Sequence, residues 1–391
     1  MVTEAKSSPH GPLLGDNQPS GGTAHFQPGK DLIATAAELS RMRVFPKDME
    51  DFCLKAMLKS GIRDEDARIT ADVLVTTDTY GVHTHGTKQL RTLMKNFRAG
   101  RLDAKAVPEV VAQGLSWAIV DGHYAMPMTS SYVAMDLAIQ KAKSTGVAYV
   151  GVKHSSHYGA AGYYAIMAAK KDMIGLSMCN VDPCMTVPGA RGKILGTNPI
   201  AYAIPAGAER PVFLDIATST VAASKVFAAR ALGKQIPDNW LVDDEGVPTT
   251  DPNHYPEQGA LLPMSGHKGY GLALLVEILT GALTGAAMLG QIQSWVLDLP
   301  DPTNEGHAFM AIDVGSMMPI QEFKNRIDWL IQEIRRSPRA KGSDRIYLPG
   351  EMEWEKRDQA LKDGMQLPGD VIASLTGLAE DIGLDIRELF K

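Results

Sequence analysis

The sequence predicts an α/β fold in which a helical N-terminal part packs against a helical C-terminal part. Apolar residues recur at helical spacing between residues 44 and 97. In the middle of the chain, short apolar runs alternate with helix-like segments, which is typical of α/β architecture. The helical pattern returns at residues 323–334, before Pro338, and at residues 371–390. Because helices flank the strands on both sides, we expect the two ends of the chain to pack together.

Three helices are expected in the N-terminal part. Pro46 suits the first turn of the first helix, and Gly61 ends it. Asp64 can cap the second helix. The third helix follows a polar turn at residues 80–86, so His85 is expected at or just before a helix N-terminus. Because that end of a helix disfavours the imidazolium ion, we expect a lowered pKa for His85.

Strands and helices alternate through the middle of the chain, and a long apolar segment at residues 269–290 follows them. This segment is long enough to cross a membrane. Glu277 lies near its centre and glycines dilute it, so a buried helix is expected instead. Strands are predicted at residues 110–111, 117–120, 147–152, 174–179, 200–204 and 212–216, and helices at residues 129–143 and 159–171.

Composition narrows the class of protein. The 391 residues are 45% hydrophobic and 21% charged, as in an ordinary globular protein. A net charge of −6 argues against a dedicated binder of nucleic acid or of anionic membranes. Three cysteines without a CxxC pair argue against a disulfide scaffold and for a reducing, cytoplasmic setting. Residues 1–30 are rich in Gly, Pro, Ser and Asn, and residues 1–43 are expected to form a mobile extension.

Several familiar nucleotide-binding and catalytic motifs are absent from the sequence. It contains no G-x-G-x-x-G fingerprint, no Walker A loop and no G-x-S-x-G elbow. Any bound nucleotide must therefore be held in another way.

Two histidine pairs are the first candidates for chemistry: His83 with His85, and His154 with His157. Both pairs lie in turns near glycine, and histidine transfers protons readily near neutral pH. Taken one at a time, each is better explained as a turn histidine with structural hydrogen bonds. The pairs also suggest zinc or iron ligands, but neither has a nearby carboxylate that completes a familiar ligand pattern.

Two further segments suggest nucleotide contacts. Residues 213–219, Phe-Leu-Asp-Ile-Ala-Thr-Ser, form a strand that ends in Asp215 and hydroxyl groups, which can bind a ribose or an amide. In residues 261–272, glycines open a helix that contains Lys268, and a helix N-terminus attracts phosphate. The plain alternatives are a capped strand-to-helix turn and a surface lysine.

Together, these segments resemble the malate/L-lactate dehydrogenase family that is unrelated to the Rossmann-type enzymes. Ureidoglycolate dehydrogenase, 2,3-diketogulonate reductase, sulfolactate dehydrogenase and cyclic-imine reductases belong to it. The resemblance runs from about Phe45 to the C-terminus. It rests on Ser-Ser-His-Tyr-Gly-Ala-Ala-Gly-Tyr-Tyr-Ala, Leu-Gly-Thr-Asn-Pro, Asp-Ile-Ala-Thr-Ser, Pro-Thr-Thr-Asp-Pro and His-Lys-Gly-Tyr-Gly-Leu-Ala-Leu.

The resemblance implies a three-part α/β fold that follows the N-terminal extension and binds NAD or NADP without a Rossmann domain. A helical part at residues 44–120 would carry His85, and a central mixed-sheet domain at residues 121–310 would bind the cofactor. A helical part at residues 311–391 would pack on the first. The resemblance also implies a homodimer that acts on a small molecule.

The resemblance also implies roles for single residues. His85 corresponds to the family's proposed acid/base, and His157 to a histidine beside the substrate and nicotinamide. Thr84 and Gln89 take the positions of substrate-binding residues. The positions implied for cofactor contacts are Asn180, Phe213, Leu214, Asp215, Ile216, Ala217, His267, Lys268, Gly350, Glu351 and Met352.

Departures from the family pattern concern the substrate. Gln89 stands where the family commonly has an arginine, four residues after His85. On one helix face that arginine would bind a substrate carboxylate bidentately, whereas a glutamine offers only neutral hydrogen bonds. Either Lys88 or Arg91 binds the carboxylate, or the substrate is not a simple 2-oxo acid. His83 replaces an acidic residue that is frequent in relatives.

Four functions follow from these observations. The first is hydride transfer between nicotinamide and C2 of a small 2-oxo or 2-hydroxy acid, with His85 as acid/base. The second is reduction of a cyclic imine or another C=N substrate. The third is a cofactor-binding relative without activity. The fourth is a metal-dependent hydrolase or lyase that uses the histidine pairs.

Overall fold

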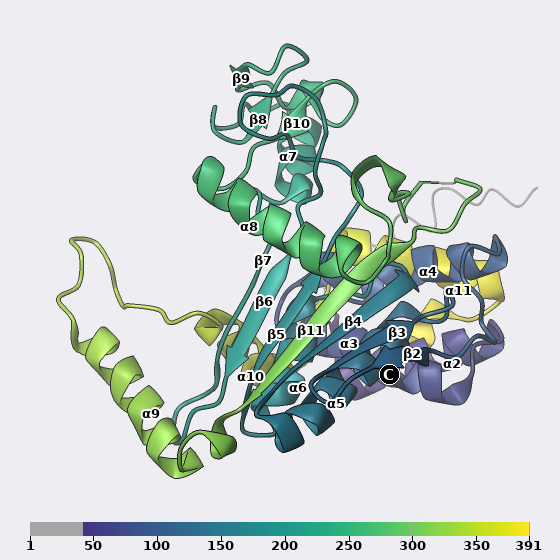
Figure 1. Cartoon of the computed structure of the whole chain (residues 1–391). Coiled ribbons are helices and arrows are strands. Elements are labelled where there is room, and N and C mark those ends of the chain that lie inside the picture. The colour runs from purple at the N-terminus through teal and green to yellow at the C-terminus, as the bar shows by residue number, and fades with distance from the viewer. Residues whose placement is uncertain (1–41, 298, 391) are drawn as a thin grey trace, which may run out of the picture.

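The computed structural model describes residues 42–297 and 299–390, and a seven-stranded mixed sheet forms its centre (Figure 1). The strand order is β2-β3-β4-β11-β5-β6-β7. The pair β3 and β4 is parallel, whereas the other neighbours are antiparallel. The predicted α/β fold with a mixed central sheet is therefore confirmed. The strands are β2 (Glu109–Gln113), β3 (Trp117–Asp121), β4 (Val147–Ser155), β5 (Met173–Cys179), β6 (Ile200–Ile204), β7 (Val212–Ile216) and β11 (Glu305–Asp313).

The middle strand β11 was missed by the sequence prediction. It inserts between β4 and β5 although it lies far from both in the sequence. Glu305 and His307 are fully buried polar residues in this strand, and they interrupt the apolar run by which a central strand is recognised.

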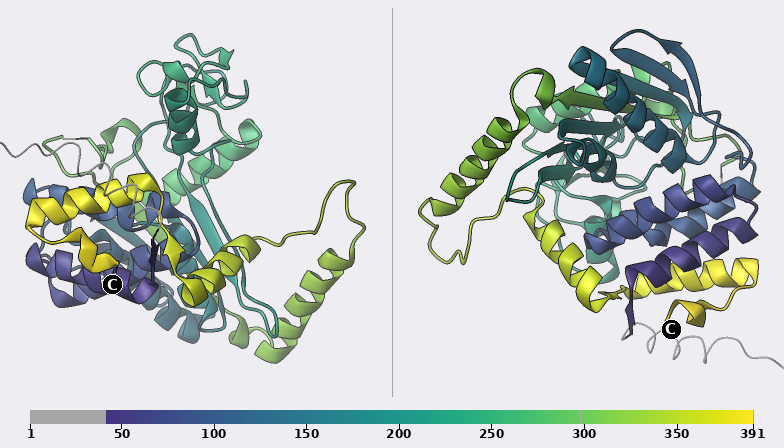
Figure 2. Two further views of the ribbon diagram at one scale, coloured as in Figure 1. Left: turned by 180° about the vertical axis from the view of Figure 1, so that it is seen from behind. Right: turned by 90° about the horizontal axis from the view of Figure 1, so that it is seen from below.

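Helices cover one face of the sheet, and helices from the two ends of the chain pack against each other (Figure 2). Helices α5 and α6 pack on β4, β5, β6 and β11, and α3 packs on α5 and α6. Helix α11 contacts α2 and α4, while β1 pairs with β12, so the ends pack together as predicted. The elements are β1 (Arg43–Val44), α2 (Pro46–Lys59), α3 (Asp64–Thr79), α4 (Leu90–Arg98), α5 (Pro127–Thr145), α6 (Ala161–Ala169), β12 (Met365–Gln366) and α11 (Gly369–Ile382).

Two parts extend from this body (Figure 1). A small lobe is built on a three-stranded sheet, and α9 projects from the opposite end of the molecule. The lobe contains α7 (Ala223–Ala231), β8 (Leu241–Val242), β9 (Pro248–Thr249) and β10 (Ala260–Leu261), and α9 (Ile320–Arg336) leads to α10 (Glu351–Asp363).

The apolar segment at residues 269–290 differs from its prediction as a buried helix. It forms α8 (His267–Glu277) and a π-helical turn, η4 (Ile278–Ala282). Several large apolar side chains of this segment face outward, including Leu275 at 46% exposure. Within the part of the chain that the structure describes, no helix is long and apolar enough to cross a membrane.

Boundaries of the predicted parts do not follow the secondary structure everywhere. The limits at 120/121 and 310/311 fall inside β3 and β11. The hairpin of β2 and β3 belongs to the central sheet, because β3 pairs with β4. Most of the predicted extension, residues 1–41, lies outside the described residues, while Arg43 belongs to β1. The last predicted helix ends earlier than expected, at Ile382, because Gly383 adopts a left-handed conformation.

Candidate active site

A cleft of about 540 Å³ lies between the N-terminal helices and the central sheet. Its walls come from the turn before α4, the loop between β4 and α6, and the end of β7. The cleft thus gathers segments that are far apart in the sequence. Of the predicted site residues, those that line it are Thr84, His85, His157, Phe213, Leu214, Asp215, Ile216, Ala217 and Gly350.

His85 lies at the end of a short 3-10 turn, η1 (His83–His85), on one wall of the cleft. Its Nδ1 lies 3.0 Å from the Thr84 hydroxyl. Burial lowers the pKa of His85, so the predicted direction is confirmed. The predicted cause is wrong, because α4 begins only at Leu90 and its N-terminus is five residues away. The protein therefore keeps this imidazole neutral near pH 7 by desolvation.

His157 faces His85 from the loop that follows β4. The two ring centroids are 5.4 Å apart. On its other side, the His157 ring stacks on Trp295, with centroids 4.3 Å apart and ring planes inclined by 8°. Burial, together with His85 and His307, lowers the pKa of His157 far below its usual value. Its Nε2 is buried and has no hydrogen-bond partner among the described residues.

This histidine pair suits proton transfer. Two neutral imidazoles share one cleft, and each can hold or release a proton. An unpartnered buried nitrogen is costly in free energy, so the Nε2 of His157 calls for a polar partner such as an ordered water or a bound molecule.

Asp215 lies across the cleft at the end of β7. Its Oδ2 accepts a hydrogen bond of 2.7 Å from the backbone N–H of Gly162 at the start of α6. The carboxylate keeps an exposed surface in the cleft, but the atoms that crowd it raise its pKa to about 6. Burial is the main cause and Glu353 adds to it, whereas the Gly162 N–H opposes the rise.

The residues at this end of the cleft fit a dinucleotide. Gly159, Ala160, Ala161 and Gly162 line the cleft with little side-chain volume at the N-terminus of α6. A Cβ atom at Gly162 would lie 3.1 Å from the Asp215 carboxylate oxygen. Small residues let a phosphate approach the helix N-terminus closely, and a carboxylate beside it can accept from a ribose hydroxyl.

Comparison with known proteins identifies the family. The family model for malate/L-lactate dehydrogenase matches residues 44–376. The chain belongs to the malate/L-lactate dehydrogenase family. It is 38% identical to malate dehydrogenase of Pyrococcus horikoshii, over 87% of this chain and 96% of that protein. The structure of that enzyme superposes with a TM-score of 0.80, over 88% of this chain and 96% of that one.

Other relatives carry different substrate names. The chain is 35% identical to L-sulfolactate dehydrogenase of Methanocaldococcus jannaschii, over 88% of this chain and 99% of that protein. That structure superposes with a TM-score of 0.82 over 88% of this chain and 99% of that one. Ureidoglycolate dehydrogenase (NAD(+)) of Escherichia coli K12 is 31% identical, over 84% of this chain and 94% of that protein. The protein is thus a dehydrogenase, and the name of the ureidoglycolate relative states NAD(+) as its cofactor.

Gln89 does not face the cleft of this dehydrogenase. Gly86 separates two 3-10 turns, so His85 and Gln89 do not share one helix face as the spacing predicted. The Gln89 amide turns back instead and donates a 2.9 Å hydrogen bond to the carbonyl of Thr84. Its Oε1 is buried and has no partner among the described residues. Lys88 and Arg91 bind Asp370 and Asp381 on α11, outside the cleft lining.

The remaining predicted cofactor residues also lie outside the lining of the cleft. Asn180 is buried, donates to the carbonyl of Ala287 and accepts from the N–H of Gly306, so it ties two segments together. Glu351 forms ion pairs with Arg335 and Arg345. The side chains that are exposed to solvent are those of His267, Lys268 and Met352.

The two histidine pairs do not converge on a metal site. His83 binds Asp78 at 2.8 Å, whereas His154 binds Asp121 at 2.9 Å in another part of the molecule. Among the residues described, no three His, Cys, Asp or Glu side chains are placed to hold a metal ion. The geometry therefore gives the hydrolase or lyase alternative no ligand set.

Sequence reasoning missed two residues that shape the site. Trp295 covers His157, but it lies in a loop with no periodic pattern to mark it. Asp78 lies behind the turn of His85 and binds His83 and Thr87. A signal for Asp78 was present, since an acidic residue at a helix end just before a glycine-rich turn commonly accepts backbone hydrogen bonds.

Proposed function

We propose that the protein transfers a hydride between nicotinamide and C2 of a small 2-oxo or 2-hydroxy acid, with His85 as acid/base. The observation that supports this most is the neutral pair of His85 and His157 in one cleft, with ring centroids 5.4 Å apart. The family assignment supplies the class of reaction.

His85 handles the proton in this proposal. In oxidation, its neutral imidazole accepts the proton of the substrate hydroxyl group. In reduction, the protonated ring donates a proton to the carbonyl oxygen. Because burial lowers its pKa, the base form dominates at pH 7, and oxidation needs no prior deprotonation. Reduction is expected to accelerate as the pH falls.

His157 orients the substrate in this proposal. Stacking on Trp295 fixes the plane of its ring, and its buried Nε2 has no partner among the described residues, so a substrate oxygen that reaches it would complete its hydrogen bonding. A fixed polar group at the reacting oxygen stabilises the charge that develops there.

Asp215 and the start of α6 would hold the cofactor, NAD or NADP. Asp215 would accept from a ribose hydroxyl or an amide, and the small residues of the Gly159–Gly162 stretch would receive phosphate. Bound nicotinamide supplies or accepts the hydride at C4. A closed cleft and fixed positions for both partners favour transfer over loss to water.

A C=N substrate is the second candidate, and one observation favours it. Among the described residues that line the cleft, there is no Lys or Arg to pair with a substrate carboxylate. Gln89, at the position of the family arginine, points away. A substrate that depends less on such an ion pair would suit this cleft.

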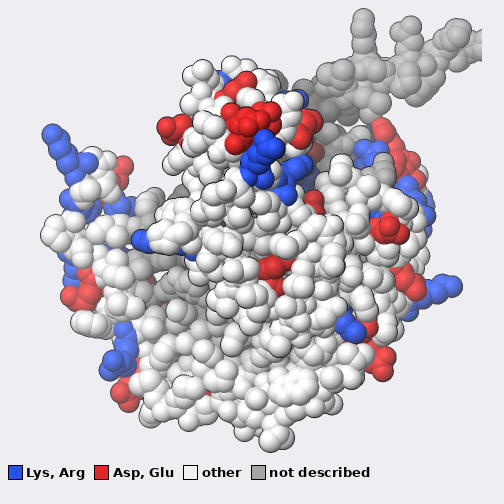
Figure 3. All heavy atoms as spheres, turned by 45° about the horizontal axis from the view of Figure 1, so that its top comes forward, with Lys and Arg blue, Asp and Glu red and all other residues white. Residues whose placement is uncertain are grey.

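We also propose that the enzyme works as a homodimer. The large apolar side chains Leu272, Leu274, Leu275, Ile278 and Leu283 are 38–55% exposed along α8 and the turns that follow it. On the face shown in Figure 3, charged residues gather on the small lobe and along the edges, and the broad middle has few. A run of exposed large apolar side chains along one helix and the turns after it is typical of an interface. Light scattering of Leu275→Glu tests the dimer, with Leu361→Glu on α10 as the exposed control.

The decisive experiment measures turnover of His85→Ala. NAD(P)H oxidation is followed with a panel of 2-oxo acids and cyclic imines, and cofactor binding by fluorescence. We expect a loss of turnover of about 100-fold or more with cofactor binding retained. His154→Ala, which lies outside the cleft lining, is the matched control. Full turnover by His85→Ala would refute the assigned role, and wild-type cofactor binding without turnover on any substrate would favour an inactive relative.

A further inference from the structure

Asp78 lies directly behind the turn that carries His85. It is the penultimate residue of α3, and its side chain is completely buried. Its Oδ1 accepts a hydrogen bond of 2.8 Å from Nδ1 of His83. Its Oδ2 accepts from the backbone N–H of Thr87 at 2.9 Å and from the Thr87 hydroxyl at 2.6 Å. One carboxylate therefore binds the turn on both sides of His85.

The backbone wraps tightly around this carboxylate. A Cβ atom at Gly86 would lie 2.1 Å from Oδ1 of Asp78, which is far inside van der Waals contact. Residue 86 must therefore be glycine for the turn to close on Asp78. No regular helix holds this segment, because η1 and η2 (Thr87–Gln89) are separate single turns. The hydrogen bonds to Asp78 supply the order that helical bonds would otherwise give.

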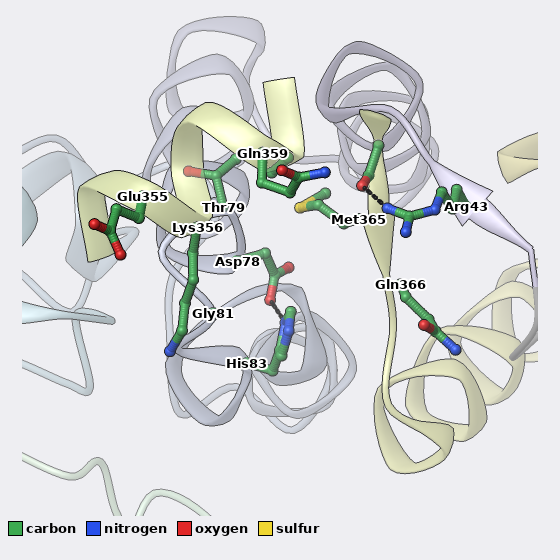
Figure 4. A pocket seen from close by; sticks show the side chains of 12 residues that line it. Arg43, Asp78, Thr79, Gly81, His83, Glu355, Lys356, Gln359, Met365 and Gln366 are labelled. Atoms are coloured by element: carbon green, nitrogen blue, oxygen red, sulfur yellow. Dashed lines mark hydrogen bonds and ion pairs between the residues drawn. The ribbon is translucent and has the colours of Figure 1, made fainter. Parts of the chain in front are cut away.

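His83 and His85 leave this turn in different directions. His85 lines the cleft with His157, whereas His83 borders a second cavity of about 470 Å³ next to α10 and β12 (Figure 4). Because His83 lines this cavity and its side chain is 21% exposed, we expect substitution at residue 83 to disturb little packed core.

We propose that Asp78 is the positioning residue of the reaction. Its carboxylate fixes the backbone at residues 84–86 and thereby the place of the His85 ring relative to substrate and nicotinamide. The inference rests on the proposed role of His85 and adds a residue that neither touches the substrate nor takes part in proton transfer. Charge-assisted hydrogen bonds are short and strong when buried, and catalysis is sensitive to displacements of about 1 Å in the acid/base group.

Paired substitutions separate this role from a general effect on packing. Thr87→Val removes one donor and nearly keeps the shape of the side chain, while Thr87→Ser keeps the hydroxyl. His83→Leu removes the other donor, while His83→Asn keeps an N–H near the position of Nδ1. Asp78→Asn keeps the shape of the acceptor and loses its charge. If Asp78→Asn does not fold, the other four variants still test the proposal, since they leave the carboxylate in place.

We expect kcat to fall by about 10- to 100-fold in Asp78→Asn and by smaller factors in Thr87→Val and His83→Leu. Thr87→Ser and His83→Asn should restore most of kcat. The Kd for NADH should remain that of the wild type in all five variants, because the cofactor end of the cleft is untouched. A purely structural role would instead lower the melting temperature and the active fraction without this rescue.

Asp66→Asn is the matched control. Asp66 is also a buried carboxylate of α3, but it binds Arg63 away from the cleft, so its loss should reduce stability and leave kcat unchanged. Wild-type kcat in Asp78→Asn or in both donor deletions would overturn the inference, as would equal kcat values for His83→Leu and His83→Asn. These outcomes leave the proposed function standing if His85→Ala is inactive. An active His85→Ala refutes the proposed function itself.

Discussion

The segment with His83 and His85 and the segment with His154 and His157 divide their histidines in the same way. The first is a short turn as predicted, whereas His154 lies in β4 and only His157 lies in the loop after it, so the prediction of a turn is wrong for His154. In each segment, one histidine is held by a carboxylate outside the cleft: His83 by Asp78 and His154 by Asp121. The other histidine of each segment lines the cleft. Burial lowers the pKa of both cleft histidines.

The difference between the two kinds of histidine shows that the groups in contact with a histidine determine its chemistry more than residue type or spacing does. A carboxylate orients a ring and makes it part of the scaffold. A ring buried in a cleft without a carboxylate stays neutral at pH 7 and keeps a nitrogen for another molecule. The scaffold histidines thus support the backbone around them, and the cleft histidines are the ones to which the proposed function gives proton transfer and substrate contact.

The largest effect should come from His157, the cleft histidine of the second segment. We expect His157→Ala to lower kcat/KM by about 100-fold, because it removes a polar contact to the reacting oxygen. His154→Ala should leave kcat/KM unchanged, because His154 lies outside the cleft lining. Steady-state kinetics of the two variants check this. Equal losses in both would end the distinction between scaffold and cleft histidines.

The pH dependence should expose the lowered pKa of His85. In the oxidation direction, kcat/KM should fall on the acid side with an apparent pKa below the usual histidine value of about 6.5. The sign follows from burial, which favours the neutral base and moves its protonation to lower pH. Because the pKa of Asp215 is about 6, the profile must be repeated in Asp215→Asn. An acid limb that vanishes in that variant would assign the titration to Asp215.

The sequence predicted the regular parts of this fold well and the site only in part. Apolar runs located the strands of the central sheet except β11, where buried Glu305 and His307 disguise the pattern. Helical spacing placed Gln89 on the face of His85, but Gly86 breaks the helix there, and the amide turns back to Thr84. Local patterns failed where a single residue redirects the backbone.

Local sequence patterns could not predict contacts between segments that are far apart in the sequence. The proximity of His85 to His157 follows from how α3 packs on α5 and α6, which spacing does not reveal. The resemblance to a family placed both in the site. No sequence feature pointed to Trp295, and only the structure shows that it stacks on His157.

Asp215 is a titratable group of the same cleft, in addition to His85 and His157. Its ionisation should affect cofactor binding. As the pH rises through about 6, its carboxylate ionises and becomes a stronger acceptor. We expect the Kd for NADH to fall by up to about 10-fold over this range, the equivalent of one charged hydrogen bond. Asp215→Asn should bind more weakly, with little dependence on pH. Fluorescence titrations between pH 5 and pH 8 test this, and an unchanged pH dependence in the variant would contradict it.

The smallest effect should come from the scaffold histidine His154. Burial tends to raise the pKa of Asp121, but hydrogen bonds from the N–H of His123 and the ring of His154 outweigh it, so the pKa is lowered. An aspartate with a lowered pKa stabilises the fold above its unfolded pKa, and that contribution disappears as the pH falls through the lower folded value. His154→Ala should therefore cost on the order of 1 kcal/mol of unfolding free energy at pH 7. This loss of unfolding free energy relative to wild type should shrink below about pH 4.

His154→Asn is the control, because it keeps a donor and tolerates the positive φ of 51° at this position. Urea unfolding of both variants at pH 7 and in acid measures the loss of unfolding free energy. A loss of equal size at both pH values would contradict the prediction. It would show that the substitution disturbs the backbone at residue 154 and not the bond to Asp121.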